Sequence, residues 1–149
     1  MSGVIVDTCI WSLALRGKST RNHQIAKELT LLIQEDRAKI IGLIRQELLS
    51  GYSDLARYET LRDKLRAFPN EQVTDSDYES AAKYSNICRS KGIQGSHIDF
   101  LICAVSIRLK MEIYTSDKDF GYYSNIFLLL YIDRDKNIEL CVYCDMLST

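Results

Sequence analysis

The chain has 149 residues, of which 46% are hydrophobic and 26% charged, a balance that fits one globular domain and excludes a disordered chain. The formal net charge of −1 argues mildly against a module that binds nucleic acid mainly by neutralising phosphates, because such modules are usually basic. It does not exclude a nuclease, since acidic residues that hold divalent cations lower the formal charge of the metal-free protein.

Strand and helix patterns alternate along the first half of the chain. In order, they predict a strand at residues 4–6, a helix at 21–36, a strand at 40–41, and helices at 44–52 and 55–68. Thr20 and Ser53 are placed to cap the two longer helices, because a side-chain oxygen there can accept a backbone N–H bond. Gly51 and Pro69 are placed to end helices.

The same alternation continues in the second half. The pattern predicts helices at residues 75–91 and 98–109, and strands at 113–115 and 126–132. Gly92 is placed to end the first of these helices, and Val73 before it is interpreted as a strand remnant. After Asp133, apolar residues at every second position from Ile138 to Val142 indicate one additional strand.

Strands that alternate with helices predict an α/β fold with a mainly parallel central sheet flanked by helices. We expect residues 1–132 to form this domain and residues 133–149 to form a C-terminal extension packed on it. The sequence contains no internal repeat and no low-complexity tract.

The five cysteines are odd in number and lie largely in apolar runs, which indicates reduced thiols rather than a disulfide framework. Cys141 and Cys144 have C-x-x-C spacing, but a zinc site needs a second pair of ligands, so we interpret both as packing residues. The N-terminus lacks the pattern of a signal peptide, and no segment approaches the ~20 apolar residues of a membrane span. We therefore expect a cytoplasmic protein.

Four acidic residues fall at comparable positions beyond predicted strands. Ligands of open parallel sheets bind beyond the carboxyl ends of the strands, and Asp7 directly follows the first strand while Asp117 follows residues 113–115. Glu47 lies in the short helix after the second strand, and Asp99 in the first turn of an apolar helix. No lysine or arginine lies within four positions of Asp99, and a buried carboxylate without a cation is costly.

Each acid also has a structural interpretation. Asp7 could cap the following helix, and Glu47 could be an acid on the solvent-facing side of its helix. Asp99 could interact favourably with the dipole at the N-terminus of its helix. Asp117 and Asp119 could be ordinary turn residues. For most of these acids taken singly, the structural interpretation is the more favoured one. Four acids at one edge of the sheet together favour a functional site.

Carboxylates without histidine, cysteine or lysine partners select Mg²⁺ or Mn²⁺. Two such ions ~4 Å apart can clamp the attacking water and the leaving oxygen of a phosphodiester displacement, so the pattern predicts a metal-dependent nuclease. Glycine-rich nucleotide-binding motifs are absent from the sequence. A phosphatase with an aspartyl nucleophile would need an acid two residues after Asp7, where the chain has Cys9.

Four segments together resemble the motifs of a PIN domain, in the right order over residues 4–131. They are VIVDTCIWSLALRG, IRQELLSG, SHIDFLICAVSI and IYTSDKDF. The chain length and the LLSGY and TSDKDF versions look most like the VapC toxins of type II toxin–antitoxin systems. The resemblance implies a five-stranded, mainly parallel sheet, Mg²⁺ or Mn²⁺ dependence, endonucleolytic RNA cleavage, a homodimer and a small antitoxin partner.

The resemblance also implies residue roles. By motif position the catalytic and metal-holding residues are Asp7, Glu47, Asp99 and Asp117. Thr8 and Thr115 match polar positions that support the acids, and Asp119 matches an additional ligand or supporting group. Cys9 stands where such domains more often have serine, which predicts a missing hydrogen bond.

Basic residues near these motifs are candidates for binding RNA phosphates. They are Arg16, Lys18, Arg45, Lys91 and Lys118. A homodimer would bury part of the helix at residues 53–68 or the one before it. Two alternatives stay open: a PIN domain of RNA processing or decay without an antitoxin, and a non-catalytic α/β domain that binds a partner.

Overall fold

The computed structural model describes residues 3–16, 19–126, 129–133 and 138–142, the last two ranges by their backbone. A sheet of six strands runs through the described part of the chain, in the order β3-β2-β1-β4-β5-β6. The strands are β1 (Val4–Val6), β2 (Ala38–Ile41), β3 (Asn70–Glu71), β4 (Glu112–Thr115), β5 (Leu129–Asp133) and β6 (Ile138–Val142). All neighbouring strands are parallel except β5 and β6. The predicted α/β fold is confirmed, with one strand more than the resemblance implied.

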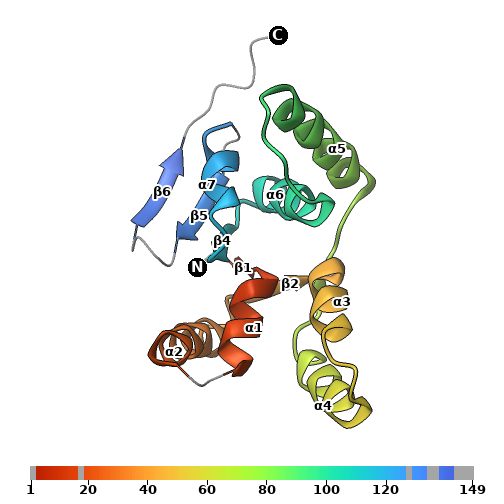
Figure 1. Cartoon of the computed structure of the whole chain (residues 1–149), viewed down its shortest axis with the longest axis vertical. Helices are drawn as coiled ribbons and strands as arrows, with labels where there is room; N and C mark the ends of the chain where they lie inside the picture. Colours follow the sequence, from red (N-terminus) through yellow and green to blue (C-terminus); the bar gives the residue numbers. More distant parts are fainter. Residues whose placement is uncertain (1–2, 17–18, 127–128, 134–137, 143–149) are drawn as a thin grey trace.

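Seven helices of the described residues flank this sheet (Figure 1). They are α1 (Thr8–Arg16), α2 (Thr20–Gln34), α3 (Gly42–Ser50), α4 (Leu55–Leu65), α5 (Asp75–Ser90), α6 (His97–Leu109) and α7 (Asp119–Ser124). Helix α1 packs against α2 and α3, whereas α5 packs against α6. Among the described residues, no helix is long and apolar enough to cross a membrane.

The core of the protein lies at the centre of the sheet. Every residue of β1 is buried, as are Ile40, Ile41 and Ile113 on the strands beside it. Helix α6 is buried from Phe100 to Ser106, so it has almost no solvent-facing side in that stretch. A long apolar helix and buried parallel strands fix the strand ends from which the acidic side chains project.

Several predicted helix ends shift by one or two residues. Ser19, not Thr20, caps α2 by accepting the Asn22 N–H at 3.0 Å. Asp54, not Ser53, caps α4 by accepting the Arg57 N–H at 3.1 Å. In both cases two hydroxyl or acidic residues stand side by side, and either could have supplied the capping oxygen.

Helix α3 begins at Gly42, directly at the end of β2, two residues before the predicted start. Gly51 does end α3, but with φ −79° and therefore without the left-handed turn that favours glycine. Gly92 after α5 has φ +73°, so there the conformational freedom of glycine is used.

The prediction of a strand remnant at Val73 is wrong; β3 is the polar pair Asn70–Glu71, which pairs with Ile40 and Ile41 of β2. Helix α7, which begins at Asp119 after β4, was not predicted from the sequence. The strand predicted at residues 126–132 is β5, which begins at Leu129. The additional strand predicted after Asp133 is β6, while residues 134–137 and 143–149 lie outside the described part.

Candidate functional site

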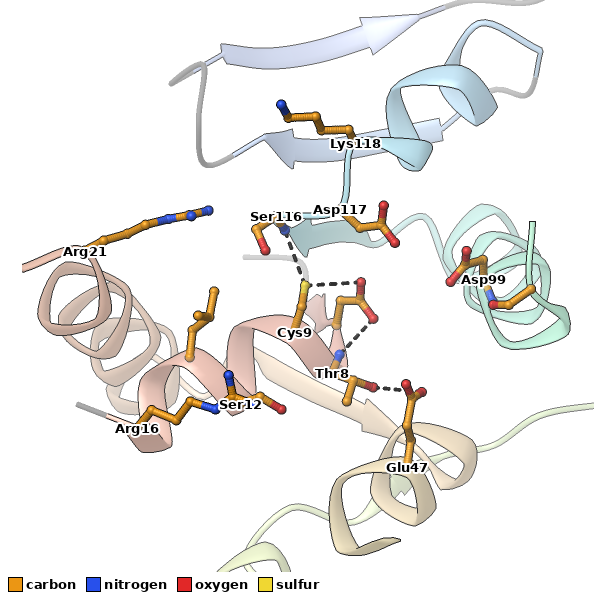
Figure 2. Close-up of a pocket in the computed structure, with 13 residues that line it drawn as sticks. Thr8, Cys9, Ser12, Arg16, Arg21, Glu47, Asp99, Ser116, Asp117 and Lys118 are labelled. Carbon is orange, nitrogen blue, oxygen red and sulfur yellow. Dashed lines mark hydrogen bonds between the residues drawn. The ribbon is translucent and has the colours of Figure 1, made fainter. Parts of the chain in front are cut away.

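A pocket of about 690 Å³ opens beyond the carboxyl ends of β1 and β4. Its walls come from α1, α2, α3, the start of α6 and the loop after β4 (Figure 2). The lining residues are Asp7, Thr8, Cys9, Ser12, Leu13, Arg16, Arg21, Glu47, Ser96, Asp99, Ser116, Asp117 and Lys118. All four acids that the sequence placed at this edge of the sheet therefore line one pocket.

Asp7 is fixed between β1 and β4. Its Oδ1 accepts the Thr8 N–H at 2.8 Å, and its Oδ2 accepts the Thr115 hydroxyl at 2.8 Å. The parallel register, in which Val6 pairs with Tyr114, places the next two residues side by side and so explains this contact. Asp7 is only 7% exposed, and burial raises its pKa although these hydrogen bonds oppose the shift.

Asp99 lies in the first turn of α6, where Ser96 caps the helix by accepting the Asp99 N–H at 3.1 Å. The Tyr123 hydroxyl donates to Asp99 Oδ2 at 3.0 Å. Burial raises the pKa of Asp99 to about 6; the hydrogen bonds from Tyr123 and Ser96 lower it, and the charges of Asp7 and Asp117 raise it further. Ionisation of Asp99 is therefore energetically unfavourable in the metal-free protein.

Asp117 and Asp119 meet Asp99 at one point. The carboxylate oxygens of these three residues lie within 4.8 Å of one another, one oxygen from each. The Thr115 hydroxyl accepts the Asp117 N–H at 3.0 Å, and Asp117 Oδ1 accepts the Asp119 N–H at 3.0 Å. Burial, and then the charge of Asp117, raises the pKa of Asp119. Asp119, which the resemblance made secondary, thus lies in the tightest group of acids among the described residues.

Glu47 reaches the pocket from α3 on the side opposite β4 (Figure 2). The Thr8 hydroxyl donates to Glu47 Oε2 at 3.2 Å, which links the start of α1 to α3. Thr8 and Thr115 therefore each hold an acid by a hydrogen bond. These are the two positions at which the resemblance implied support.

The expectation of a missing hydrogen bond at Cys9 is wrong. Cys9 Sγ donates to Asp7 Oδ2 at 3.5 Å, contacts the Thr115 hydroxyl at 3.6 Å and accepts the Ser116 N–H at 3.4 Å. The larger radius of sulfur allows contacts at these distances. Burial, helped by the charge of Asp7, raises the pKa of the thiol, so Cys9 remains a protonated donor at neutral pH.

The predicted basic residues separate into different groups. Arg16 and Lys118 line the pocket. Lys91 is the C-cap residue of α5 and is not among the lining residues. Arg45 is not among the lining residues either; it donates to Asn70 Oδ1 at 2.9 Å, to the Leu65 carbonyl at 3.0 Å and to the Phe68 carbonyl. Lys18 lies outside the described residues, as do Cys144 and the side chain of Cys141.

Arg21 and Tyr123 are among the residues at or beside the pocket that were not singled out from the sequence. Arg21 lines the pocket from the start of α2, and its only sequence signal is its place in the first turn of that helix. Tyr123 holds Asp99 from α7. Its spacing of four residues from Asp119 is the signal, because residues i and i+4 share a helix face.

The donor set fits a hard divalent cation. The pocket gathers carboxylate oxygens, and among the described residues the groups that shift the pKa of Asp99 are hydroxyls and other acids, with no cation. Oxygen ligands of this kind suit Mg²⁺ and Mn²⁺. The arrangement can therefore concentrate positive charge where a phosphate group enters the pocket.

Comparisons with known proteins agree with this geometry. The PIN domain model matches residues 4–125. A comparison with curated proteins finds no match.

Solved structures with the same fold include the following three. VapBC-1 from nontypeable Haemophilus influenzae has a TM-score of 0.68 at 15% identity, covering 89% of this chain and 98% of that chain. DNA-bound VapBC from Salmonella typhimurium has a TM-score of 0.67 at 16% identity, covering 81% and 92%. FitAcB from Neisseria gonorrhoeae has a TM-score of 0.60 at 18% identity, covering 80% and 91%. At these identities the likeness is one of fold.

Proposed function

Because the chain belongs to the PIN domain family, we propose that it is a metal-dependent endoribonuclease and the toxin of a type II toxin–antitoxin pair. The observation that carries this proposal is the meeting of Asp99, Asp117 and Asp119 within 4.8 Å, in a site whose pocket also contains Asp7 and Glu47. A purely structural role explains one such acid but not their convergence.

In this proposal Asp7, Glu47, Asp99 and Asp117 hold Mg²⁺ or Mn²⁺, with Asp119 as an additional ligand. The bound metal supplies positive charge at the scissile phosphate and a water of lowered pKa. The raised pKa values of Asp7 and Asp99 support this role, because a cation stabilises the ionised carboxylates that burial disfavours.

The remaining residues of the pocket position these groups and the RNA. Thr115 holds Asp7, and Thr8 holds Glu47, so that both carboxylates keep one orientation. Arg16, Arg21 and Lys118 lie on the side of the pocket away from Asp99 (Figure 2), where they contact phosphates of the bound strand. Such contacts fix the position of the strand without reading its sequence.

The fold supports the partner we propose. The solved structures with this fold include VapBC and FitAcB. By analogy, we place this chain in the cytoplasm as a homodimer that a small antitoxin binds and inhibits. An active PIN nuclease without an antitoxin would have the same pocket, so coexpression with the product of a neighbouring small gene separates these two cases.

The decisive experiment is cleavage of total RNA by the full chain, with Mn²⁺ and with a chelator, followed by sequencing of the new ends. We expect defined cleavage sites with Mn²⁺ and none with the chelator. Asp117→Asn removes a pocket charge, and Asp63→Asn, in the exposed part of α4, is its matched control. Metal-independent cleavage, or equal cleavage by Asp117→Asn, would reject the proposed site.

A further inference from the structure

We propose that Tyr123 is a positioning residue of the metal site, which sets the orientation of the Asp99 carboxylate through its buried hydroxyl. This inference rests on the proposed function and adds a residue outside the four motif acids. Tyr123 does not line the pocket, so it acts through Asp99 rather than on the substrate.

The first step is the burial of the hydroxyl. Tyr123 is 0% exposed, and its hydroxyl donates to Asp99 Oδ2 at 3.0 Å. A buried tyrosine hydroxyl needs a partner, and here the partner is a carboxylate of the site. The bond fixes the rotation of the Asp99 carboxylate and occupies one of its lone pairs, which leaves the others for a cation.

The second step is the rigidity of the tyrosine ring. The centroid of the Tyr123 ring lies 5.2 Å from that of Phe100 and 5.3 Å from that of Phe120. Phe100 follows Asp99 on α6, and Phe120 lies on α7 with Tyr123. The donor is therefore held from both helices and cannot turn away without disturbing the core.

The third step is the space left by Gly95. A Cβ atom at this position would lie 3.0 Å from Tyr123 Cζ and nearer still to the hydroxyl oxygen, and it would lie 2.6 Å from Cζ of Phe100, the ring that packs on Tyr123. The path of the Tyr123 side chain to Asp99 therefore requires a residue without a side chain just before α6. The same contact gives a second and independent way to displace the hydroxyl.

The test compares Mn²⁺ affinity, measured by calorimetry on the full chain, for the wild type and for Tyr123→Phe. The substitution keeps the ring and removes the hydroxyl. We expect a loss of about tenfold or more in affinity, as for other groups that orient metal ligands. Tyr122→Phe is the matched control, because this neighbour is 57% exposed, and it should bind Mn²⁺ like the wild type.

Cleavage separates positioning from catalysis. At limiting Mn²⁺, Tyr123→Phe should cut RNA more slowly than the wild type, and saturating Mn²⁺ should restore it. Asp99→Asn should not be restored. Gly95→Ala should also weaken Mn²⁺ binding, whereas Gly51→Ala, where a Cβ meets only ordinary contacts, should not.

The outcomes distinguish this inference from the proposed function. Wild-type affinity for Mn²⁺ in Tyr123→Phe would overturn the positioning role and leave the nuclease intact, even if the variant melted earlier. A wild-type protein that neither binds Mn²⁺ nor cuts RNA would overturn the metal site itself and this inference with it.

Discussion

Asp77 of α5 and Asp99 of α6 lie on two helices that pack against each other, and their carboxylates meet different partners. Asp77 is 2% exposed and accepts two hydrogen bonds from the Arg108 guanidinium, both at 2.8 Å. Asp99 meets a hydroxyl and two other acids. Burial would raise the pKa of Asp77, but Arg108 and Thr74 outweigh it and hold that pKa below its usual value. The pKa of Asp99 is raised to about 6.

The protein compensates the charge of Asp77 with its own arginine, whereas it leaves the charge of Asp99 without a basic partner. A buried carboxylate needs a cation, and α6 supplies one for Asp77 at its own C-terminal end. At the N-terminal end of the same helix, Asp99 faces Asp117 and Asp119. The first arrangement stabilises the fold, and the second leaves a repulsion between carboxylates that a bound divalent cation would relieve.

The largest expected difference between the two carboxylates is in RNA cleavage. Asp99→Asn keeps the shape of the side chain but removes the charge that would hold the metal, so RNA cleavage should fall on the order of a thousandfold or more. Asp77→Asn is the matched control and should retain cleavage at a temperature where it is folded. Single-turnover cleavage rates measure both, and a catalytic loss in Asp77→Asn alone would reverse our assignment.

For the free energy of unfolding we expect the opposite order, with the larger loss in Asp77→Asn. Asp77→Asn leaves Arg108 without its charged partner, and because Arg108 is about a third exposed the loss should be about 2 kcal/mol rather than the 3–5 of a fully buried pair. Asp99→Asn should leave the free energy of unfolding equal or higher, since it relieves repulsion. Urea denaturation in the presence of a chelator measures both, and a loss in Asp99→Asn would make that acid structural.

The patterns that were predictable from the sequence are those set by burial. β1 is apolar and β-branched, and residues 113–115 of β4 are buried, because both faces of these strands are covered; the acids that follow the two strands share one edge for topological reasons. Asp7 and Asp117 could therefore be placed together without a structure.

The rest depends on partners that are distant in sequence. Asn70 and Glu71 form a strand only because β2 lies beside them, and Arg45 is held by carbonyls of residues 20 and 23 positions away. The partnership of Tyr123 with Asp99 likewise needs α7 to pack on α6. The partners of Arg45 leave no local pattern in the sequence, and the i, i+4 spacing of Tyr123 from Asp119 does not by itself reveal a contact with Asp99.

The third prediction concerns pH. The pKa of Asp99 is higher in the folded than in the unfolded state, so the folded protein binds more protons between pH 4 and 6 and its stability falls as pH rises through that range. A shift from 3.8 to about 6 corresponds to about 3 kcal/mol at most, and because Asp99 is partly exposed to screening solvent we expect a fall of about 1–2 kcal/mol relative to Asp99→Asn, measured by urea denaturation without metal. Asp77, with a lowered pKa, acts in the opposite sense: its stabilisation is lost only as pH falls below about 4. Identical profiles for the wild type and Asp99→Asn would show that Asp99 carries no such shift.

The smallest expected effect is the stabilisation by Mn²⁺, which would supply the positive charge that the acids around Asp99 lack. Mn²⁺ binds the folded state, where the acids are assembled, so at about ten times its Kd it should add about 1.4 kcal/mol of stability and raise the melting temperature by a few degrees. Asp77→Asn should gain the same increment from its lower starting point, because its site is intact. Asp99→Asn should gain little, since the carboxylate that meets Asp117 and Asp119 has lost its charge. Equal increments in all three proteins would mean that Mn²⁺ binds elsewhere, and that the repulsion around Asp99 is tolerated for a reason other than metal binding.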